Sequence, residues 1–388
     1  EKLLEHYDEL SDHIKVETKD PDLYPKFTSQ YTDQTVAANS VIVVCGDKSK
    51  VVSNSDMWET STNYQTYQTQ TTGFDGEGQI TSAITYVTSE NNPKVYWVTG
   101  HGEASESDLS TNFSDAINKN NVEISDLALM TDDIPEDAEE LVIMSPTTDF
   151  SEDEANKVIT YLENGGKLLM FTSYTGTDMP NLDSILENYG VKRSSGIVVE
   201  TDSQHYYPQM PYYLLPNIQS DDITTEVKSN YILMPVAQAI QKLDSYRDTI
   251  TIKSLLTTTE DAYIENDPEN STWSKSADSE TGAFDLGVSI TETVDDKETQ
   301  IIYFSSASML SSQIDQAISG ANSKLAATAL TSMCDVEQTV VIPSKSTSYT
   351  NLVFTQGAVN TWSIITIAGI PLVLVVIGVM IWMKRRKQ

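Results

Sequence analysis

Basic residues are scarce in this sequence. Its 388 residues include 24 Lys and Arg against 57 Asp and Glu, which gives a formal net charge of −33 at pH 7. A surface this acidic repels the phosphate backbone of DNA and RNA, and it mainly keeps a protein soluble. The charge balance therefore argues against nucleic acid as a partner.

Cysteine and histidine are scarce as well. With only Cys45 and Cys334, the chain has no Cys-x-x-Cys pair for redox chemistry. Cys45 lies in the apolar run SVIVVCG and Cys334 follows an Ala- and Leu-rich run. We therefore favour two separately buried thiols, with a disulfide as the alternative. Of the four histidines, His101 could bind a metal with Glu103 and a distant His205, but nothing in the spacing requires it. The sequence predicts neither a metal nor a cofactor.

Motifs for catalysis and phosphate binding are absent too. The chain lacks Gly-x-x-x-x-Gly-Lys-Ser/Thr, so ATP hydrolysis would have to come from a partner. The turn Gly100-His101-Gly102-Glu103 follows a strand-like run and offers no Ser or Cys for a nucleophile elbow. Ser105 stands where a dinucleotide-binding loop has its third glycine. The sequence therefore predicts no catalytic residue.

The same turn is well placed for a contact site. Open α/β sheets bind ligands at the carboxyl ends of their strands, and backbone N–H groups at a helix start favour anions. We expect His101 and Glu103 to project there as ligand or partner contacts, while Gly100 and Gly102 serve the backbone of the turn. The alternative is a corner of the scaffold, in which Glu103 only complements the helix dipole.

A second candidate is the run HYYPQMPYYLLPNI at residues 205–218. Tyrosine gives contact area at a low entropic cost, so such loops often form recognition surfaces. We expect His205, Tyr206 and Tyr207 to contact a ligand or partner. A proline-stiffened loop packed on the edge of a sheet explains the run equally well.

One long run has no charge at all. Ile364–Met383 comprises 20 apolar and uncharged residues, enough for a helix to span a bilayer core of about 30 Å. Trp362 and Trp382 lie at its ends as interfacial anchors, and four basic residues follow it. The positive-inside rule then predicts a single C-terminal span in the cell membrane, with the large domain extracytoplasmic and the C-terminus cytoplasmic. The chain also begins within a helical pattern, so we expect a segment upstream.

From about residue 77, helices and strands alternate, which predicts a parallel sheet with helices on both faces. Within it, Leu109, Phe113, Ala116 and Ile117 share one face of a helix, and Ser151 to Glu154 form a capping box. Residues 1–53 suit a thioredoxin-like α/β unit that lacks its first strand, with a strand at IKVETKD and a hairpin of SVIVVCG and KVVS.

The predicted division has a few short segments around one large domain. It runs as follows: the α/β unit at 1–53, a polar linker at 54–76, the main α/β domain at 77–335 with an irregular insertion at about 195–275, a tether at 336–363, the transmembrane helix at 364–383 and a basic tail at 384–388.

Several segments, taken in order, resemble the GldG-like family of auxiliary proteins of ABC transporters. They are LLEHYDELSDHIKVETKDPDLYPKFTSQY, VYWVTGHGE, FSEDEANKVITYLENGGKLLMF and PYYLLPNI followed by ILMPVAQAI. The resemblance implies a class I glutamine amidotransferase-like (flavodoxin-like) domain without its catalytic machinery. It also implies an N-terminal membrane span, and a permease and an ATPase as partners.

The leading hypothesis is a non-enzymatic, membrane-anchored, extracytoplasmic subunit of an ABC transporter that binds a ligand or partner. One alternative is a free-standing surface module that binds glycan or protein through the tyrosine-rich run. The other is a hydrolase whose catalytic group does not show in the sequence.

Overall fold

The computed structural model describes residues 2–20, 23–24, 26–32, 35–63, 68–89, 92–269, 272–334, 342, 344–346 and 354–386. The chain divides into two compact units. The first contains Glu1–Pro93, Asp115–Glu123 and Asp335–Thr350, and the second contains Lys94–Ser114, Ile124–Cys334 and Asn351–Gln388. We describe each unit by itself.

The first unit contains two hairpins and the helices α1 and α2. Its elements are α1 (Lys2–Leu10), the 3-10 turn η1 (Thr28–Gln30), β1 (Val41–Cys45), β2 (Lys48–Val52), β3 (Trp58–Asn63), β4 (Gln68–Phe74), α2 (Gly76–Thr88) and β19 (Lys345–Ser346). β1 and β2 pair antiparallel, with Cys45 opposite Lys48, so this hairpin prediction is confirmed. A small core of Val52, Met57 and Ala83 joins α2 to the hairpin.

Other predictions for this unit are wrong. Residues 14–20 have no regular secondary structure, and the helix expected after them is only η1, so the described residues lack the thioredoxin-like order. Residues 54–76 are not a linker, because β3 and β4 pair there and β19 joins β4. Threonine favours strands through its branched Cβ. Residues 54–76 contain many threonines, but their polarity suggested a linker. Cys45 is exposed, because its hairpin has only two strands, and both cysteines are free.

The second unit holds an eleven-stranded sheet among its described residues. The elements up to β9 are β5 (Lys94–Val98), η2 (Glu106–Asp108), α3 (Thr111–Lys119), β6 (Glu123–Leu127), β7 (Glu140–Met144), α4 (Glu152–Glu163), β8 (Lys167–Phe171), α5 (Pro180–Asn188) and β9 (Val191–Val199). The later strands are β10 (Tyr206–Tyr207), β11 (Met210–Leu214), β12 (Asn217–Ile218), β13 (Met234–Pro235), β14 (Gln238–Lys242), β15 (Ile250–Thr257), β16 (Tyr263–Glu265), β17 (Asp285–Val294) and β18 (Lys297–Phe304). The remaining turns and helices before the tail are η3 (Thr225–Val227), η4 (Ala307–Leu310), α6 (Ser312–Ala317) and α7 (Ala321–Met333).

The strand order is β16-β9-β14-β17-β18-β8-β7-β5-β6, with β15 on β17 and β12 on β15. The predicted parallel sheet is confirmed for β18, β8, β7 and β5. The strands on the β9 side pair antiparallel. Residues 195–275 are therefore not an irregular insertion, since most of their strands extend this sheet, while β10, β11 and β13 form a small separate one. The fold is mixed α/β.

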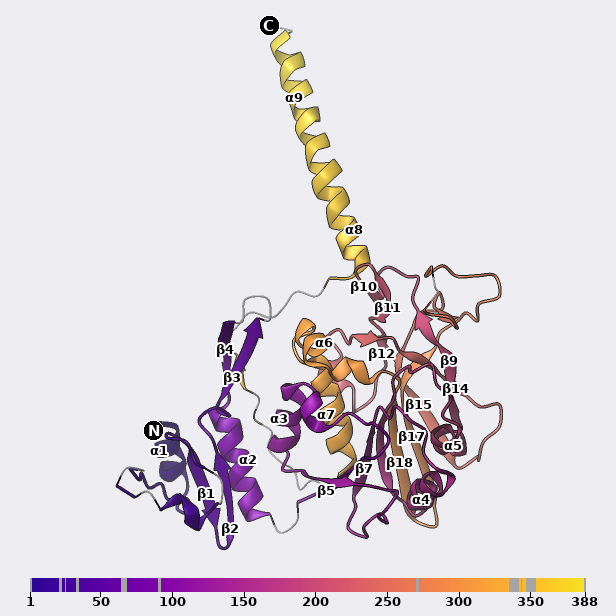
Figure 1. Cartoon of the computed structure of the whole chain (residues 1–388). Coiled ribbons are helices and arrows are strands. Elements are labelled where there is room, and N and C mark those ends of the chain that lie inside the picture. The colour runs from indigo at the N-terminus through magenta and orange to yellow at the C-terminus, as the bar shows by residue number, and fades with distance from the viewer. Residues whose placement is uncertain are drawn as a thin grey trace. The chain divides into compact units, whose positions relative to one another are not determined.

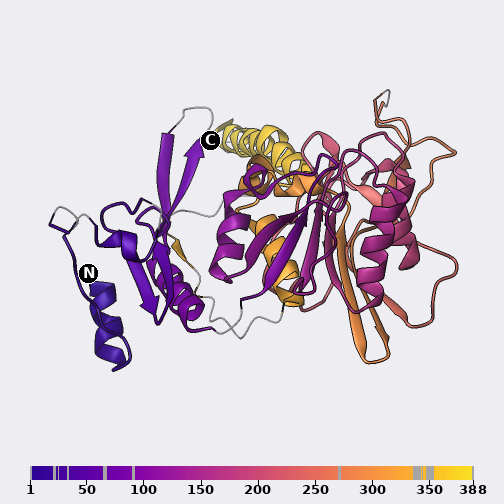
Figure 2. The same ribbon diagram turned by 60° about the horizontal axis from the view of Figure 1, so that its bottom comes forward.

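Helices cover both faces of the sheet, as the magenta α4 and α5 and the orange α7 show in Figures 1 and 2. Apolar side chains of α4 and α5 join the sheet in one core, among them Val158, Leu162 and Ile185, which are fully buried. Burying a side chain of this size stabilises the fold by about 1.5–3 kcal/mol. On α3, Phe113 and Ile117 are buried as the spacing predicts.

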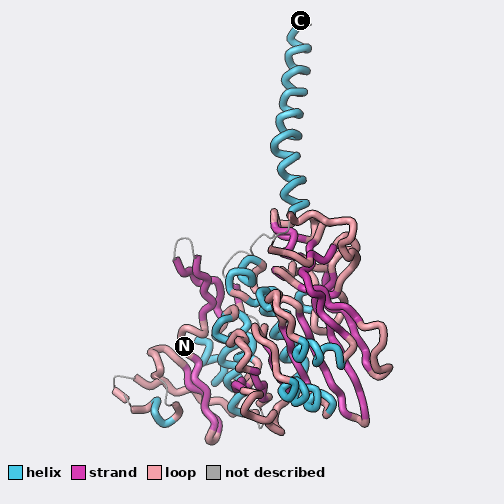
Figure 3. The backbone as a smooth tube through the Cα atoms, turned by 45° about the vertical axis from the view of Figure 1, so that its right-hand side comes forward, coloured by secondary structure: helices cyan, strands magenta, loops and turns pink. Residues whose placement is uncertain are grey.

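The C-terminal helix is one continuous segment in Figure 3. It comprises α8 (Gln356–Ile364), a π-helical turn, η5 (Ile365–Gly369), and α9 (Ile370–Arg386). The π turn precedes Pro371, which has no N–H to donate and which transmembrane helices accommodate by such adjustments. The helix is long and apolar enough to span a membrane, over Gln356–Arg386. The predicted tether at 336–363 is thus helical from Gln356, and much of the rest lies outside the described residues.

Candidate functional site

The turn after β5 is held by the loop after β7. Gly100 has φ +122° and Gly102 has φ +78°, which L side chains adopt at a cost. The carbonyl of His101 accepts hydrogen bonds from the backbone N–H groups of Thr147, at 2.9 Å, and Thr148, at 3.0 Å. A Cβ at Gly102 would lie 2.1 Å from Oγ1 of Thr147. The backbone conformation therefore favours glycine at both positions.

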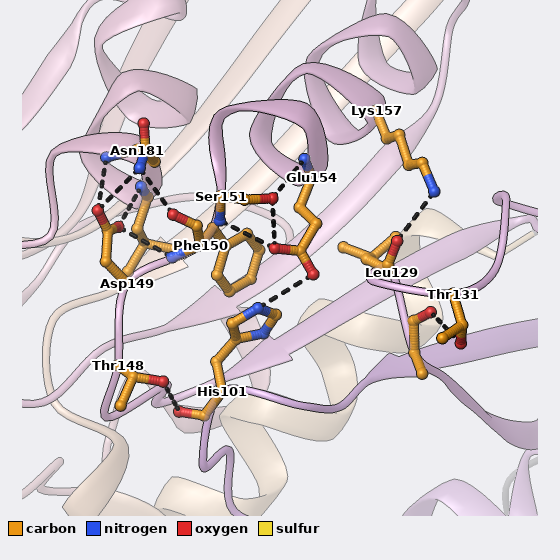
Figure 4. Close-up of polar contacts among 12 residues, drawn as sticks. His101, Leu129, Thr131, Thr148, Asp149, Phe150, Ser151, Glu154, Lys157 and Asn181 are labelled. Carbon is orange, nitrogen blue, oxygen red and sulfur yellow. Dashed lines mark hydrogen bonds and ion pairs between the residues drawn. The ribbon is translucent and has the colours of Figure 1, made fainter.

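The imidazole of His101 lies between two carboxylates, of which Figure 4 shows Glu154. Its Nδ1 is 3.0 Å from Oε1 of Glu103, and its Nε2 is 3.2 Å from Oε1 of Glu154. The three side chains are only 4%, 2% and 5% exposed, respectively. The Phe150 ring packs on the imidazole, with centroids 4.1 Å apart. We call His101, Glu103 and Glu154 the His101 cluster.

The two carboxylates are positioned by their own backbone bonds. Oε2 of Glu103 accepts the N–H of His101 at 2.7 Å. Oε2 of Glu154 accepts the N–H of Ser151 at 2.8 Å and its hydroxyl at 2.7 Å, which confirms the predicted capping box of α4. Each carboxylate thus uses one oxygen locally and turns the other toward the imidazole.

Burial and hydrogen bonding act in opposite directions on Glu154. Burial alone raises the pKa of Glu154, but the hydrogen bonds from Ser151 and the nearby His101 outweigh it and hold that pKa below its usual value. The low pKa keeps Glu154 ionised, with its Oε1 turned toward Nε2 of His101.

The expectation that His101 and Glu103 project as exposed contacts is wrong, because both side chains are buried. The sequence reasoning also missed Phe150 and the second role of Glu154. The capping box identified Glu154 as a helix cap, but no local pattern shows that its other oxygen meets a residue more than 50 positions earlier in the chain. The cluster ties the β5 turn to the start of α4.

Ser145 lies in a backbone conformation that is typical of a nucleophile at a sharp turn. It follows β7 with φ +54°, a strained conformation for a residue other than glycine. Its hydroxyl donates to Oγ of Ser173 at 2.8 Å. A serine nucleophile needs a neighbouring base, whereas both nitrogens of His101 face glutamates. The arrangement is a hydroxyl pair and not a catalytic dyad.

The tyrosine-rich run lies on other elements. Tyr206 and Tyr207 form β10, which pairs with β11, and all three predicted contact residues of this run are half-buried. Nδ1 of His205 lies 3.1 Å from the carbonyl of Leu215. These bonds stay within the run and do not reach the Gly100–Glu103 turn, so the structure presents two separate features.

The described residues contain no group of three or more His, Cys, Asp or Glu side chains arranged to hold a metal ion. The described residues also form an open groove of about 920 Å³. It lies by the starts of β7 and β8, where Glu139, Tyr161 and Lys167 line it. The β5 turn is at the carboxyl ends of these parallel strands, so the groove and the turn are distinct.

Comparison with known proteins places the chain in a family. Residues 92–332 match the family described as an ABC-type uncharacterized transport system. The chain belongs to this auxiliary ABC transport family, as the resemblance predicted. No curated protein matches the sequence.

Three solved structures are weakly similar to this chain. The mmIFT52 N-terminal domain is 14% identical with a TM-score of 0.45, covering 62% of this chain and 96% of its own. The exo-beta-1,4-mannosidase Op5Man5 from Opitutaceae bacterium strain TAV5 is 11% identical with a TM-score of 0.32, covering 65% and 37%. A ThuA-like protein from Parabacteroides merdae is 12% identical with a TM-score of 0.34, covering 69% and 99%. At these scores they carry no functional inference.

Proposed function

We propose that the chain is a non-enzymatic, membrane-anchored subunit of a GldG-like ABC transporter, which binds a ligand or partner outside the cytoplasm and conveys its presence to the permease. The observation that carries the proposal is the family match over 92–332 combined with the apolar helix Gln356–Arg386 on the same chain. Together they support a soluble α/β domain held beside a membrane-embedded transporter.

The orientation is supported by the end of the helix. Lys384, Arg385 and Arg386 form its last turn, and the guanidinium of Arg386 lies 5.2 Å from the centre of the Trp382 ring. A tryptophan beside basic residues is typical of the cytoplasmic interface of a span. The acidic folded domain would then lie on the other side, as proposed.

The non-enzymatic part is supported by the His101 cluster. A general base must offer a free nitrogen to its substrate, whereas His101 directs both nitrogens to buried carboxylates. A class I glutamine amidotransferase-like domain without its catalytic machinery agrees with that arrangement. In this proposal the β5 turn is a rigid part of the scaffold, and ligand or partner contact falls to other surfaces.

Co-purification from native membranes tests the proposal. The full chain, tagged at its C-terminus, is extracted in mild detergent, and its companions are identified by mass spectrometry. We expect a permease and an ATPase in amounts comparable to the chain. A matched control carries the same tag on an unrelated single-span protein. Recovery of a folded, membrane-inserted chain without these subunits would overturn the proposal in favour of a free-standing module.

Topology is tested in the same cells. Protease added to intact cells should digest the folded domain while the C-terminal tag stays protected. Digestion of the tag with the domain protected would reverse the proposed orientation.

A further inference from the structure

The start of the C-terminal helix is hydrogen-bonded to the residues on both sides of β10. The N–H of Gly357 donates to the carbonyl of Ser203 at 2.7 Å, and the N–H of Gln209 donates to Oε1 of Gln356 at 2.9 Å. The hydroxyl of Thr355, which also caps the helix, donates to Oε1 of Gln204 at 3.0 Å. These three bonds attach the first turn of the helix to the folded domain.

Glycine at position 357 permits this close approach. Gly357 is buried, and a Cβ there would lie 1.4 Å from Nε2 of Gln204 and 2.3 Å from its Cδ. Any larger residue therefore displaces the Gln204 side chain, whose Oε1 accepts the hydroxyl of Thr355. The helix start is built to pack on this loop.

The junction places the loop close to the bilayer. The uncharged membrane run begins at Ile364, eight residues after Gln356, which is about 12 Å along an α-helix. The headgroup layer on each side of the hydrocarbon core is about 5–8 Å thick. Gln209, bonded to Gln356, then lies about 4–7 Å above the headgroup layer when the helix is upright. Helix tilt brings it nearer, within the reach of a long side chain.

The chemistry of this surface suits an interface with lipid. Residues 203–220 contain no Asp, Glu, Lys or Arg, in a chain with 57 acidic residues. Met210 is 38% exposed, and the partly exposed Tyr212 packs on Trp273 with ring centroids 4.4 Å apart. Tyrosine and tryptophan favour the membrane interface, where the ring meets lipid and the polar atom meets water.

We propose that residues 203–214 form a bilayer-contacting surface whose tyrosines and Met210 lie in the lipid headgroup layer, held there by the Gly357 junction. The surface fixes the height of the α/β domain above the membrane. In this proposal the tyrosine-rich run contacts lipid and not a soluble ligand. The proposal rests on the membrane anchoring in the proposed function, but it holds whichever side of the membrane the domain occupies.

Fluorescence quenching by lipid tests the surface. The full chain carries Cys45→Ser, and the remaining Cys334 is buried, with burial raising the pKa of its thiol, so it reacts poorly with labels. Met210→Cys is labelled with an environment-sensitive fluorophore. The chain is placed in nanodiscs of phosphatidylcholine and phosphatidylglycerol, with or without a nitroxide on the headgroup. We expect at least a twofold loss of fluorescence with the nitroxide lipid.

Val294→Cys is the matched control, because Val294 is 46% exposed. Val294 ends β17, and Asp285 begins it. Asp285 pairs with Thr257 of β15, and Thr257 pairs with Asn217, which follows residues 203–214 closely. Nine residues of strand separate the two ends by about 30 Å, so we expect less than 10% quenching. Gly357→Val should lower quenching at Met210→Cys while the span stays inserted.

Equal quenching at the two positions, or none at Met210→Cys, would overturn the assignment. Protection of Met210→Cys only when the permease is present would also overturn it, because the surface would then be a protein interface.

Discussion

Replacing His101 by alanine tests the importance of the His101 cluster. The change removes the imidazole from between two carboxylates that are 2% and 5% exposed. Deleting the partner of a buried charge costs about 3–5 kcal/mol, because the charge is left buried without compensation. The contact with Phe150 is lost as well. We take the lower bound, about 3 kcal/mol, for a cluster beneath a loop.

A loss of this size is easily measured. For domains of 150–250 residues, 1 kcal/mol shifts Tm by about 2–4 °C, so His101→Ala should lower Tm by about 6–12 °C. The full chain in nanodiscs can be followed by tryptophan fluorescence. Trp97 reports on the turn directly, since its Nε1 donates to the carbonyl of Ala104 at 2.9 Å and its ring is buried. The exposed His6→Ala is the control, with an expected effect within about 0.5 kcal/mol.

Adding Glu154→Gln to His101→Ala should recover part of the loss, because the second change removes one uncompensated carboxylate. A Tm for His101→Ala within about 1 °C of wild type, with His6→Ala the same, would show that the cluster does not stabilise the fold. The reasoning about buried charge would then be refuted.

Three further outcomes follow from the structure. The pKa of Glu154 is lower in the folded chain than its usual value of 4.5, so the carboxylate stabilises the fold above pH 4.5 and loses this effect as pH falls. The Tm advantage of wild type over Glu154→Gln should therefore shrink between pH 6 and 3. A Tm difference that stays constant over this range would contradict the prediction. Burial raises the pKa of Glu140 well above 4.5. Ionising this buried carboxyl opposes folding increasingly as pH rises above 4.5, so Glu140→Gln should melt higher than wild type at pH 8 but not at pH 4. A lower Tm of Glu140→Gln at both pH values would contradict the prediction. Gly102→Val should cost about 1–3 kcal/mol through its φ of +78° and the clash with Thr147, whereas Gly378→Ala, with open space around it, should melt within about 1 °C of wild type.

Helix–strand alternation was enough to predict the parallel half of the sheet. β5, β7 and β8 are short buried runs between helices with clear caps, such as Ser151 and Glu154 on α4. The antiparallel half was harder to predict from the sequence, because prolines interrupt residues 195–275. The strands there also pair with partners distant in the sequence, as β9 does with β14 and β16. In the first unit, a Thr- and Gln-rich hairpin without apolar alternation looked like a linker.

The candidate site shows the same limit. The two glycines of the β5 turn follow from local geometry that a sequence displays. The burial of His101 does not, because it depends on Glu154, brought in by the start of α4 from another part of the chain. A charged turn and a buried ion-pair cluster have the same local sequence.

We propose that this chain is an auxiliary subunit that acts on a transporter without chemistry of its own. The most direct measurement is the ATP hydrolysis rate of the co-purified permease and ATPase in nanodiscs, with and without the chain. We expect no ATP hydrolysis by the chain alone and at least a twofold change in the hydrolysis rate of the complex when the chain is present. An unchanged rate in a complex that contains the chain, or hydrolysis by the chain itself, would overturn the proposal.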